Sequence, residues 1–504
     1  MPDLNNAAAA REQLASDIPA LVWRRVVADT LTPVGAAQRL MESERGDFLL
    51  ESVEGGENRG RYSLLGLAPD LVFRSNAARV AINNRWASDR TAFRDVDQPP
   101  IEALRQLVVD CHIAVPDGLP PALACLVGYF GYETIGFAED IARAPASDLD
   151  VPDILFVRPT LLLVFDNLSD DLSVIAPLWP GAGEPDQAIR SASDRIDDAL
   201  RTLDGPFARL APHTAADLPE PVLTPQIAQA DYRAMVAQAK EYIAAGDIFQ
   251  VVLAQRFTCP FPLPPFALYR ALRRVNPSPF LYFLDLPDFA VVGSSPEILV
   301  RVRDGEVTIR PIAGTRPRGT TPDADRAAER ALLADPKECA EHLMLLDLGR
   351  NDVGRVAAAD SVVTTNSYGV ERYSHVMHIV SNVVGTLSPE NDALDALFAG
   401  FPAGTVSGAP KLRACEIIAE LEPETRGAYA GGVGYFAPDG SVDSCIVLRT
   451  AVVKDGVMHV QAGAGIVADS DATYEQRECK AKAGALLAAA KEAVRMAGEA
   501  GFGQ

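Results

Sequence analysis

The chain alternates apolar runs with polar segments, and the period of each run predicts its secondary structure. PTLLLVFD and DLSVIAPL are strand-like runs in the first part of the sequence. Further on, ADYRAMVAQAKEYIAAGDIFQVVLAQRF predicts an amphipathic helix, a break at Gly-Asp and a strand. Later runs, VRVRDGEVTI and AVVKDGVMHV among them, are joined by Asp-Gly, a typical hairpin turn. The pattern predicts mainly antiparallel sheets and therefore an α+β fold.

Changes in composition divide the chain into three segments. Residues 20–205 alternate strand-like runs with short helices, and residues 227–497 contain the amphipathic helix and the hairpins. Between them, residues 206–226 are rich in proline and alanine, which is typical of a linker or a long surface loop. We expect an N-terminal part packed on a C-terminal part.

The stretch DPKECAEHLMLLDLGRND predicts a capped helix. Asp335 is a good N-cap, Pro336 suits the first helical position, and Gly349 predicts the end. Glu338 is placed to complete a capping box with Asp335, but Glu341, one turn later on the same face, has no such explanation.

A second pair of carboxylates occurs far along the chain. Glu475, Glu478 and Lys482 are spaced to share one face of another predicted helix. Either pair can be a solvated surface face. If the two faces meet, close carboxylates repel by about 4 kcal/mol per pair at a surface-like dielectric. A cation bound by oxygen ligands would relieve this repulsion, and Mg²⁺ suits such ligands.

Composition narrows the possible functions. The 504 residues are 48% hydrophobic and 23% charged, as in an ordinary globular protein, and the formal net charge is −22. This charge argues against nucleic-acid or anionic-membrane surfaces as partners. An anionic substrate would need a local cation. The seven cysteines are scattered without a C-x-x-C pair, so neither a zinc site nor a disulfide framework is expected.

Targeting signals are also missing from the sequence pattern. The segment MPDLNNAAAAREQLASDIP lacks a basic region and an apolar core, and no apolar run is long enough to span a membrane. We therefore expect a cytoplasmic protein.

Several single residues are candidates for chemistry. Arg449, in the apolar run CIVLRTAVV, is predicted on a strand, where it would either bind a carboxylate or form an internal ion pair. His378 would be a catalyst or a hydrogen-bonded core residue. Glu297 follows a Ser-Ser-Pro turn and can be a turn-end surface charge. Thr405 lies in a glycine-rich loop that lacks the P-loop pattern.

The segment QAGAGIVA contains G-x-G-x-x-A after a strand. Its strand belongs to a predicted hairpin and not to a βαβ unit, so a dinucleotide site is not expected. Gly463 and Gly465 instead allow backbone N–H groups to approach a bound anion.

Nine motifs in order resemble the chorismate-utilising enzymes over about residues 20–495. They are NPSPFLYFL, GSSPEILVRV, RPIAGTRPRG, ECAEHLMLLDLGRNDVGRV, YSHVMHIVSNVVG, FPAGTVSGAPKLRACEII, YAGGVGYF, CIVLRT and QAGAGIVADSDATYEQRECKAKA. Near the N-terminus, FLLESVEGGENRGRYSLLG is similar to component I of anthranilate synthases. The resemblance implies two largely antiparallel β-sheets packed with flanking helices.

The resemblance also implies roles for individual residues. Glu341 and Glu478 match direct Mg²⁺ ligands, and Glu338 and Glu475 match their supporting carboxylates. Glu297 matches a general acid for the C4 hydroxyl of chorismate, and His378 the histidine associated with proton removal. The remaining positions match substrate contacts, with Thr405 also assigned to catalysis: Gly314, Thr315, Thr405, Tyr429, Arg449, Gly463, Gly465 and Lys482.

Two positions discriminate within this family. Ala313 stands where aminodeoxychorismate synthases generally carry a nucleophilic lysine, and Gln250 where isochorismate and salicylate synthases carry a lysine that activates water. Ammonia needs no such base. Both positions favour amination of chorismate followed by loss of pyruvate, the first committed step of tryptophan synthesis.

The resemblance implies partners as well. No cysteine lies in the G-x-C-x-G setting of a class I glutamine amidotransferase, so a separate amidotransferase subunit and a hetero-oligomer are expected. Two alternatives remain open: an aminodeoxychorismate synthase component I and a non-catalytic tryptophan-binding subunit.

Feedback inhibition by L-tryptophan is a further expectation. The segments LLES and NPSPF resemble the tryptophan pocket of the family, although by themselves they suit a strand end and a turn. The residues expected to line the pocket are Ser52, Pro279, Phe280, Val433 and Tyr435.

Overall fold

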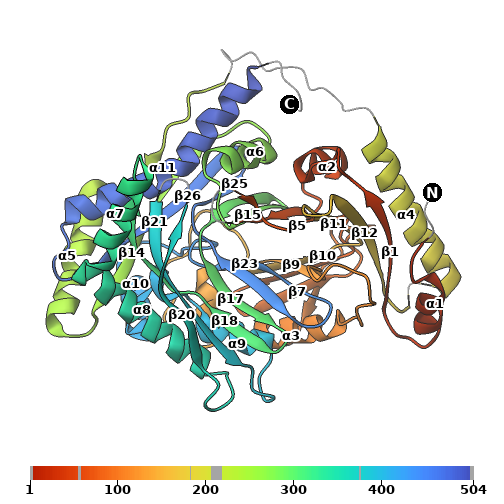
Figure 1. Ribbon diagram of the computed structural model, residues 1–504, viewed down its shortest axis with the longest axis horizontal. Helices are drawn as coiled ribbons and strands as arrows, with labels where there is room; N and C mark the ends of the chain where they lie inside the picture. Colours follow the sequence, from red (N-terminus) through yellow and green to blue (C-terminus); the bar gives the residue numbers. More distant parts are fainter. Residues whose placement is uncertain (1–3, 55–57, 182, 206–217, 374–375, 500–504) are drawn as a thin grey trace.

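Two large antiparallel sheets face each other in the computed structural model, which describes residues 4–54, 58–181, 183–205, 218–373 and 376–499 (Figure 1). In strand order, the first sheet contains β1 (Ala20–Val27), β12 (Asp171–Leu178), β11 (Leu161–Asp166), β5 (Tyr62–Leu67), β2 (Asp47–Glu51), β15 (Phe280–Leu286), β16 (Phe289–Ser295), β25 (Thr450–Lys454), β26 (Val457–Ile466), β14 (Gln250–Pro260) and β13 (Thr224–Pro225), with β22 (Gly408–Ala409) also paired to β14.

The second sheet is also antiparallel. In strand order it contains β19 (Ile312–Pro317), β21 (Val376–Thr386), β18 (Glu306–Ile309), β17 (Ile298–Arg303), β24 (Val442–Ile446), β23 (Gly432–Phe436), β9 (Leu126–Phe130), β10 (Ile154–Arg158), β6 (Leu71–Asn76), β7 (Arg79–Asn83) and β8 (Arg94–Val96), with β20 (Val363–Arg372) also paired to β21. A separate small hairpin joins β3 (Val53–Glu54) to β4 (Asn58–Arg59).

Both faces of the first sheet are buried, which explains its continuous apolar runs. Neighbouring residues Phe48 and Leu49 are both fully buried, yet they belong to different hydrophobic clusters. Phe48 packs in the cluster shared with the second sheet, and Leu49 packs in a cluster that instead includes the helix residues Ala192, Leu272 and Leu486. Successive side chains of a strand point to opposite faces, so a core lies on each side of this sheet.

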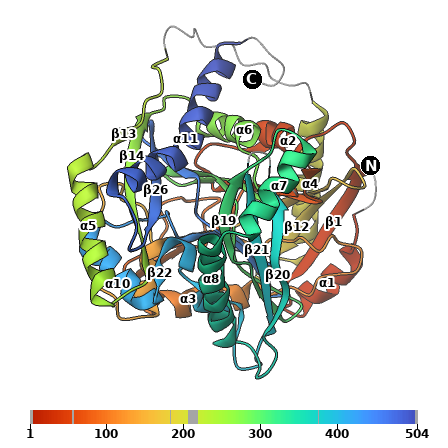
Figure 2. The ribbon, with the colours of Figure 1, turned by 60° about the vertical axis from the view of Figure 1, so that its left-hand side comes forward.

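Helices cover the outer surfaces of the sheets. They are α1 (Ala7–Ala15), α2 (Pro33–Leu40), α3 (Pro100–Asp110), α4 (Pro185–Asp204), α5 (Gln229–Ala245), α6 (Pro265–Val275), α7 (Pro322–Leu333), α8 (Pro336–Gly354), α9 (Ala393–Gly400), α10 (Lys411–Leu421) and α11 (Ala472–Ala497), with the 3₁₀ turns η1 (Tyr132–Phe137) and η3 (Gly404–Val406). Helices α6 and α11 pack together, and α7 and α8 contact β19 and β21, as Figure 2 shows. The predicted α+β fold with two antiparallel sheets is confirmed.

Each sheet contains strands from both predicted parts of the chain. In the first sheet β2 pairs with β15, and in the second β9 pairs with β23. Most of the predicted linker, residues 206–217, lies outside the described residues, while Thr224–Pro225 pairs with β14. The proposed division into two parts remains a prediction.

The Asp-Gly turns predicted from the sequence are observed, whereas one predicted helix end is not. The Asp304-Gly305 and Asp455-Gly456 turns both have positive φ and join antiparallel strands. The predicted end of a helix at Gly349 is wrong, because α8 continues to Gly354. Gly349 serves packing instead: a Cβ there would lie 3.0 Å from Cγ of Pro311.

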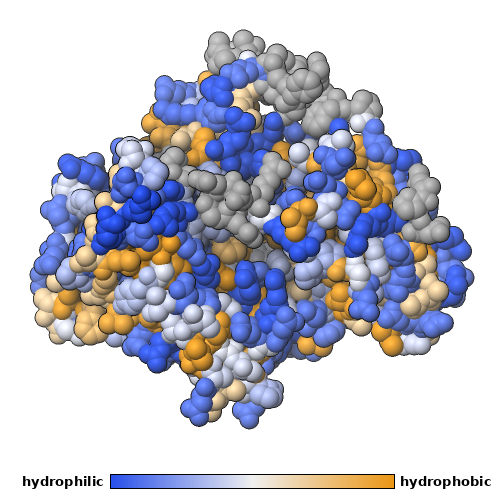
Figure 3. Space-filling view, in the orientation of Figure 1, coloured by the Kyte–Doolittle hydropathy of each residue, from blue (hydrophilic) through white to orange (hydrophobic). Residues whose placement is uncertain are grey.

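None of the helices in the part of the chain that the structure describes combines the length and apolarity that crossing a bilayer requires. The face in Figure 3 is largely hydrophilic, with scattered apolar patches. All seven cysteines are free thiols.

Candidate active site

Two chain crossings between the sheets position two of the predicted site residues. Glu297 joins β16 in the first sheet to β17 in the second, and Arg449 lies between β24 and β25, which belong to different sheets. The predicted strand through Arg449 is therefore wrong: its φ of 46° turns the chain. Ser294 N–H donates to the Arg449 carbonyl at 3.2 Å, so the crossings lie side by side.

Glu297 is a buried carboxyl group and not the surface charge considered above. Only 7% of the residue is exposed, and the Thr405 hydroxyl donates to its two carboxyl oxygens at 3.1 and 3.2 Å. Burial raises the pKa of Glu297 to about 8, although the Thr405 hydrogen bond acts in the opposite direction. The group can therefore hold a proton at neutral pH and donate it.

His378, on β21, is held in one tautomer. Its Nδ1 lies 3.1 Å from the Gly314 carbonyl and 3.1 Å from the Thr315 hydroxyl. A carbonyl only accepts, so Nδ1 carries the proton and Nε2 keeps its lone pair. Burial lowers the pKa of His378, which also favours the neutral base.

Tyr373 is a site residue that the sequence reasoning missed. Its ring meets the His378 ring edge-on, with centroids 5.6 Å apart. Its hydroxyl donates to Glu371 at 2.9 Å, and Glu371 also pairs with Arg310. The motif YSHVMHIVSNV begins with this tyrosine, and that position was the available signal.

Arg449 has the environment of an anion-binding group. Within the described ranges, no carboxylate forms an ion pair with it, so the internal pair considered above is not formed. Burial lowers the pKa of Arg449, and the neighbouring Tyr373 opposes this effect. A partly desolvated guanidinium of this kind is stabilised by a bound carboxylate.

Tyr429, Gly463 and Gly465 form a narrow wall beside β14. A Cβ on Gly463 would lie 2.9 Å from the Tyr429 hydroxyl, and one on Gly465 would lie 2.9 Å from Nε2 of Gln250. At Gly463 a Cβ would also lie 3.1 Å from the Leu253 carbonyl oxygen, so close approach favours glycine there, whereas at Gly465 the end of the Gln250 side chain could move aside. Lys482 Nζ donates to the Gly463 carbonyl at 2.9 Å, which brings α11 to the same wall.

The two pairs of glutamates face each other from α8 and α11. Burial raises the pKa of Glu341, and the nearby charges of Glu338 and Glu478 raise it further. Glu475 is 7% exposed, and burial raises its pKa. The carboxylates of one helix therefore repel those of the other.

The four carboxylates are ligands of the type that a hard cation prefers. In the structure, however, they do not converge on a single point. Lys482 pairs with Glu478 at 2.8 Å, and Arg316 lies 3.5 Å from Glu338. Across the described ranges, no three histidine, cysteine or acidic side chains converge closely enough to hold a metal ion. The donor set is all carboxylate oxygen, which fits Mg²⁺.

A separate cavity of about 360 Å³ lies between the sheets. Ser52, Phe280, Val433 and Tyr435 all line this space, which we call the Ser52 cavity; Pro279 does not line it. Arg301 and Arg303 border it beside Asp443, which lies 3.2 and 3.6 Å from them. Four of the five residues expected in the tryptophan pocket are thus brought together.

Sequence comparisons identify close relatives over almost the whole chain. A family described as "chorismate binding enzyme" matches residues 47–488. The anthranilate synthase component 1 of Cereibacter sphaeroides is 51% identical over 96% of this chain and 97% of its own length. That of Pseudomonas putida is 47% identical over 92% of this chain and 93% of its own.

Solved structures give the same fold. Anthranilate synthase component I from Streptococcus pneumoniae is 35% identical, with a TM-score of 0.74 over 92% of this chain and 99% of the other. The menaquinone-specific isochorismate synthase of Escherichia coli is 20% identical, with a TM-score of 0.68 over 96% and 98% of the two chains, so this likeness concerns the fold alone.

Proposed function

The chain belongs to the chorismate-binding enzymes, and from this premise we propose that it is the chorismate-converting component of an anthranilate synthase. The proposed reaction converts chorismate and ammonia to anthranilate, pyruvate and water. The observation that carries the proposal is the buried Glu297, whose carboxyl group is protonated near neutral pH. Hydroxide is a poor leaving group, and this acid can protonate it.

Two proton transfers follow from the site. Ammonia attacks C2 of the ring as the C4–O bond breaks, and the C4 hydroxyl leaves as water with the proton of Glu297; the new ammonium group then loses a proton, which restores the acid. His378 Nε2 next accepts the C2 proton as the C3–O bond breaks and the ring becomes aromatic, and the departing enolpyruvate takes up a proton at its CH2 carbon to become pyruvate. The Gly314 carbonyl fixes the tautomer that this step needs, and Thr315 supports the same ring.

The cationic side chains, together with the wall of Tyr429, Gly463 and Gly465, would orient the substrate. Arg449 would bind the enolpyruvyl carboxylate with help from Tyr429 and the backbone at Gly465. Gly463 and Lys482 would contact the ring side, and Thr405 would hold Glu297 toward it. Binding a dianion in a protein with a net charge of −22 requires local cations of this kind.

We assign Mg²⁺ to the glutamate faces of α8 and α11. Glu341 and Glu478 would hold the ion directly, and Glu338 and Glu475 would support them. When bound, Mg²⁺ would supply positive charge for the ring carboxylate of chorismate. The repulsion that raises the pKa of Glu341 supports the assignment, since a cation would relieve it.

Ammonia would come from a partner. The relatives are named component 1, which agrees with a second subunit, and a glutamine amidotransferase is the chemistry required. The isolated chain should therefore use ammonium but not glutamine. Glutamine-dependent turnover by this chain alone would contradict the proposal.

L-Tryptophan is the proposed ligand of the Ser52 cavity. The cavity offers aromatic and apolar walls together with arginine and carboxylate groups, which suits an amino acid with both charges. Strand β23 leads from Tyr429 to this cavity, and β24 leads from it to Arg449. A ligand that binds two states of these strands unequally would alter the active site.

Product identification tests the proposed function. The protein is incubated with chorismate, Mg²⁺ and ammonium, and anthranilate is measured by fluorescence and chromatography. An aminodeoxychorismate product would favour the alternative reaction, which Ala313 already disfavours. A protein that binds tryptophan but forms neither product would be a non-catalytic subunit.

A further inference from the structure

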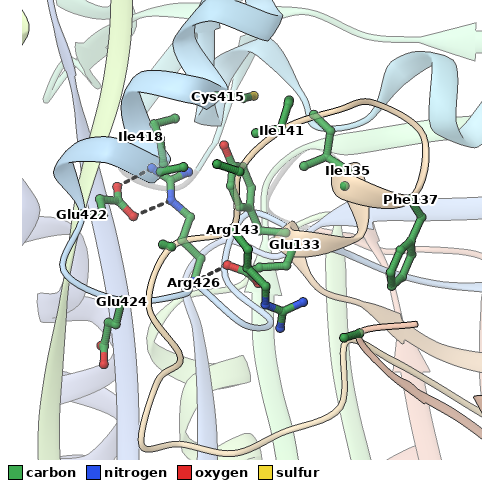
Figure 4. Close-up of a pocket in the computed structure, with 16 residues that line it drawn as sticks. Glu133, Ile135, Phe137, Ile141, Arg143, Cys415, Ile418, Glu422, Glu424 and Arg426 are labelled. Atoms are coloured by element: carbon green, nitrogen blue, oxygen red, sulfur yellow. Dashed lines mark hydrogen bonds and ion pairs between the residues drawn. The ribbon is translucent and has the colours of Figure 1, made fainter. Parts of the chain in front are cut away.

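A buried ion pair forms one wall of a cavity of about 190 Å³ between η1 and α10 (Figure 4). Arg426 and Glu422 are only 3% and 4% exposed. Arg426 Nε donates to Glu422 at 2.8 Å, and Nη2 donates to the other carboxylate oxygen at 2.5 Å. A pair removed from water this completely is costly unless further hydrogen bonds satisfy it.

Those further bonds go to the backbone of the active site. Arg426 Nη1 donates to the carbonyl of Val406 at 2.8 Å, and Val406 directly follows Thr405 in η3. The guanidinium also lies 5.5 Å from the centre of the Tyr429 ring. Arg426 thus contacts both the segment that holds the acid and the tyrosine of the wall.

The same pair holds the strand opposite the two glycines. Arg426 Nη2 donates to the Val252 carbonyl at 2.7 Å, and Glu422 accepts from Ala254 N–H at 2.8 Å. In the pairing of β14 with β26, Val252 lies opposite Gly465 and Ala254 opposite Gly463. The ion pair therefore fixes the partner residues of both glycines.

We propose that Arg426, paired with Glu422, is a positioning residue that sets Thr405 and the Gly463–Gly465 wall in register with each other. This inference rests on the proposed function. A planar guanidinium can reach the carboxylate and two carbonyls at once, whereas a lysine ammonium cannot match that geometry. A hydrophobic pair would leave both carbonyls without their donor.

The test uses Arg426→Lys, with Arg143→Lys as its matched control. Arg143 lines the same cavity, and within the described ranges its side chain forms its hydrogen bonds and ion pair with Asp153 and none with η3 or β14. For each variant, kcat and KM for chorismate are measured with ammonium across pH, together with thermal unfolding. We expect Arg426→Lys to lower kcat by at least about tenfold, because small misplacements of catalytic groups are costly, and Arg143→Lys to behave like the parent.

The pH profile separates positioning from general destabilisation. The Thr405 hydroxyl lowers the pKa of Glu297. Moving this hydroxyl away from Glu297 should therefore shift the alkaline limb of the kcat–pH profile to higher pH. Tyr373 interacts electrostatically with Glu297, and Arg310 and Asp352 line the small space around it; these three groups pair with Glu371 and Lys411 and not with Arg426, so they should stay in place. We expect Arg426→Lys to shift this limb as Thr405→Val does, and the double variant to shift it no further. The inference would be overturned if the shifts of the two single variants added fully in the double variant. It would also be overturned if Arg426→Lys folded but its alkaline limb did not shift.

Glu422→Gln provides a second test, which decides the matter if Arg426→Lys does not fold. Glu422 contacts β14 but not η3, so its effect should fall mainly on KM for chorismate, which rises severalfold. An unchanged KM would overturn the inference. Absence of anthranilate formation by the parent would contradict the proposed function instead, so the two failures are distinguishable.

Discussion

Glu297 and the Ser52 cavity both lie where the two sheets approach each other, but they differ in the space around them. Glu297 and Thr405 border a space of only about 30 Å³, whereas the Ser52 cavity has about 360 Å³. A tightly enclosed carboxyl group keeps its proton because ionisation there is disfavoured. A preformed hollow with apolar walls and a few charged groups instead suits reversible binding.

The two regions share strands although their environments differ. Val433 and Cys445 line the Ser52 cavity from β23 and β24, and the same strands connect to Tyr429 and Arg449. The comparison implies that the chemistry of one region can be removed while ligand binding in the other is retained. Four predictions test this separation.

Removal of the proposed metal should have the largest effect. We expect EDTA to abolish turnover and added Mg²⁺ to restore it, while tryptophan binding, followed by calorimetry, is retained. Glu341→Ala should behave like the chelated protein. Glu492→Ala, a change near the far end of α11 where the glutamate pairs with Arg495, is the control and should stay active. Full turnover of the metal-free protein would refute the metal assignment.

Glu297→Gln should lower kcat by about 10²–10⁴-fold, because an amide cannot supply the proton. The change is nearly isosteric and removes no charge at neutral pH, so thermal unfolding should show a folded protein. Tryptophan affinity should be that of the parent. A variant with parental kcat would show that another group protonates the leaving hydroxyl.

The pH dependence should be smaller and follows from the sign of the pKa shift. Activity needs protonated Glu297, so kcat at constant free ammonia should fall as pH rises through about 8. The folded-state pKa lies above the ordinary value of 4.5, so the contribution of this group to stability decreases between these two pH values. Thermal unfolding at pH 5 and 8.5 should therefore show a larger loss for the parent than for Glu297→Gln. Equal losses would contradict a buried, protonated carboxyl group.

Filling the Ser52 cavity should have the smallest effect on catalysis. We expect Ser52→Phe to leave ammonium-dependent turnover largely unchanged while raising the tryptophan concentration needed for inhibition. Pro279→Ala is the matched control, because Pro279 adjoins Phe280 but does not line the cavity, and should affect inhibition less. Inhibition of Ser52→Phe at the parental tryptophan concentration would place the regulatory site elsewhere.

Much of the local structure could be predicted from the sequence. The antiparallel hairpins follow from Asp-Gly turns, and the cap of α8 follows from Asp335, whose side chain accepts from the N–H groups of Lys337 and Glu338. The wrong predictions at Gly349 and Arg449 concern positions whose backbone structure depends on long-range packing. Gly349 accommodates Pro311 instead of ending α8, and Arg449 turns between sheets instead of continuing a strand.

The sequence by itself determined the types of element, the antiparallel sheets and the spacing of the paired glutamates, because period, turns and caps are local properties. Only the tertiary structure decided that Glu297 is buried, that Arg449 lacks a carboxylate partner among the described residues, and that Arg426 reaches three separate segments. Burial and the pKa shifts it causes depend on which distant residues exclude water from a group. That information arises when residues far apart in the chain are brought together.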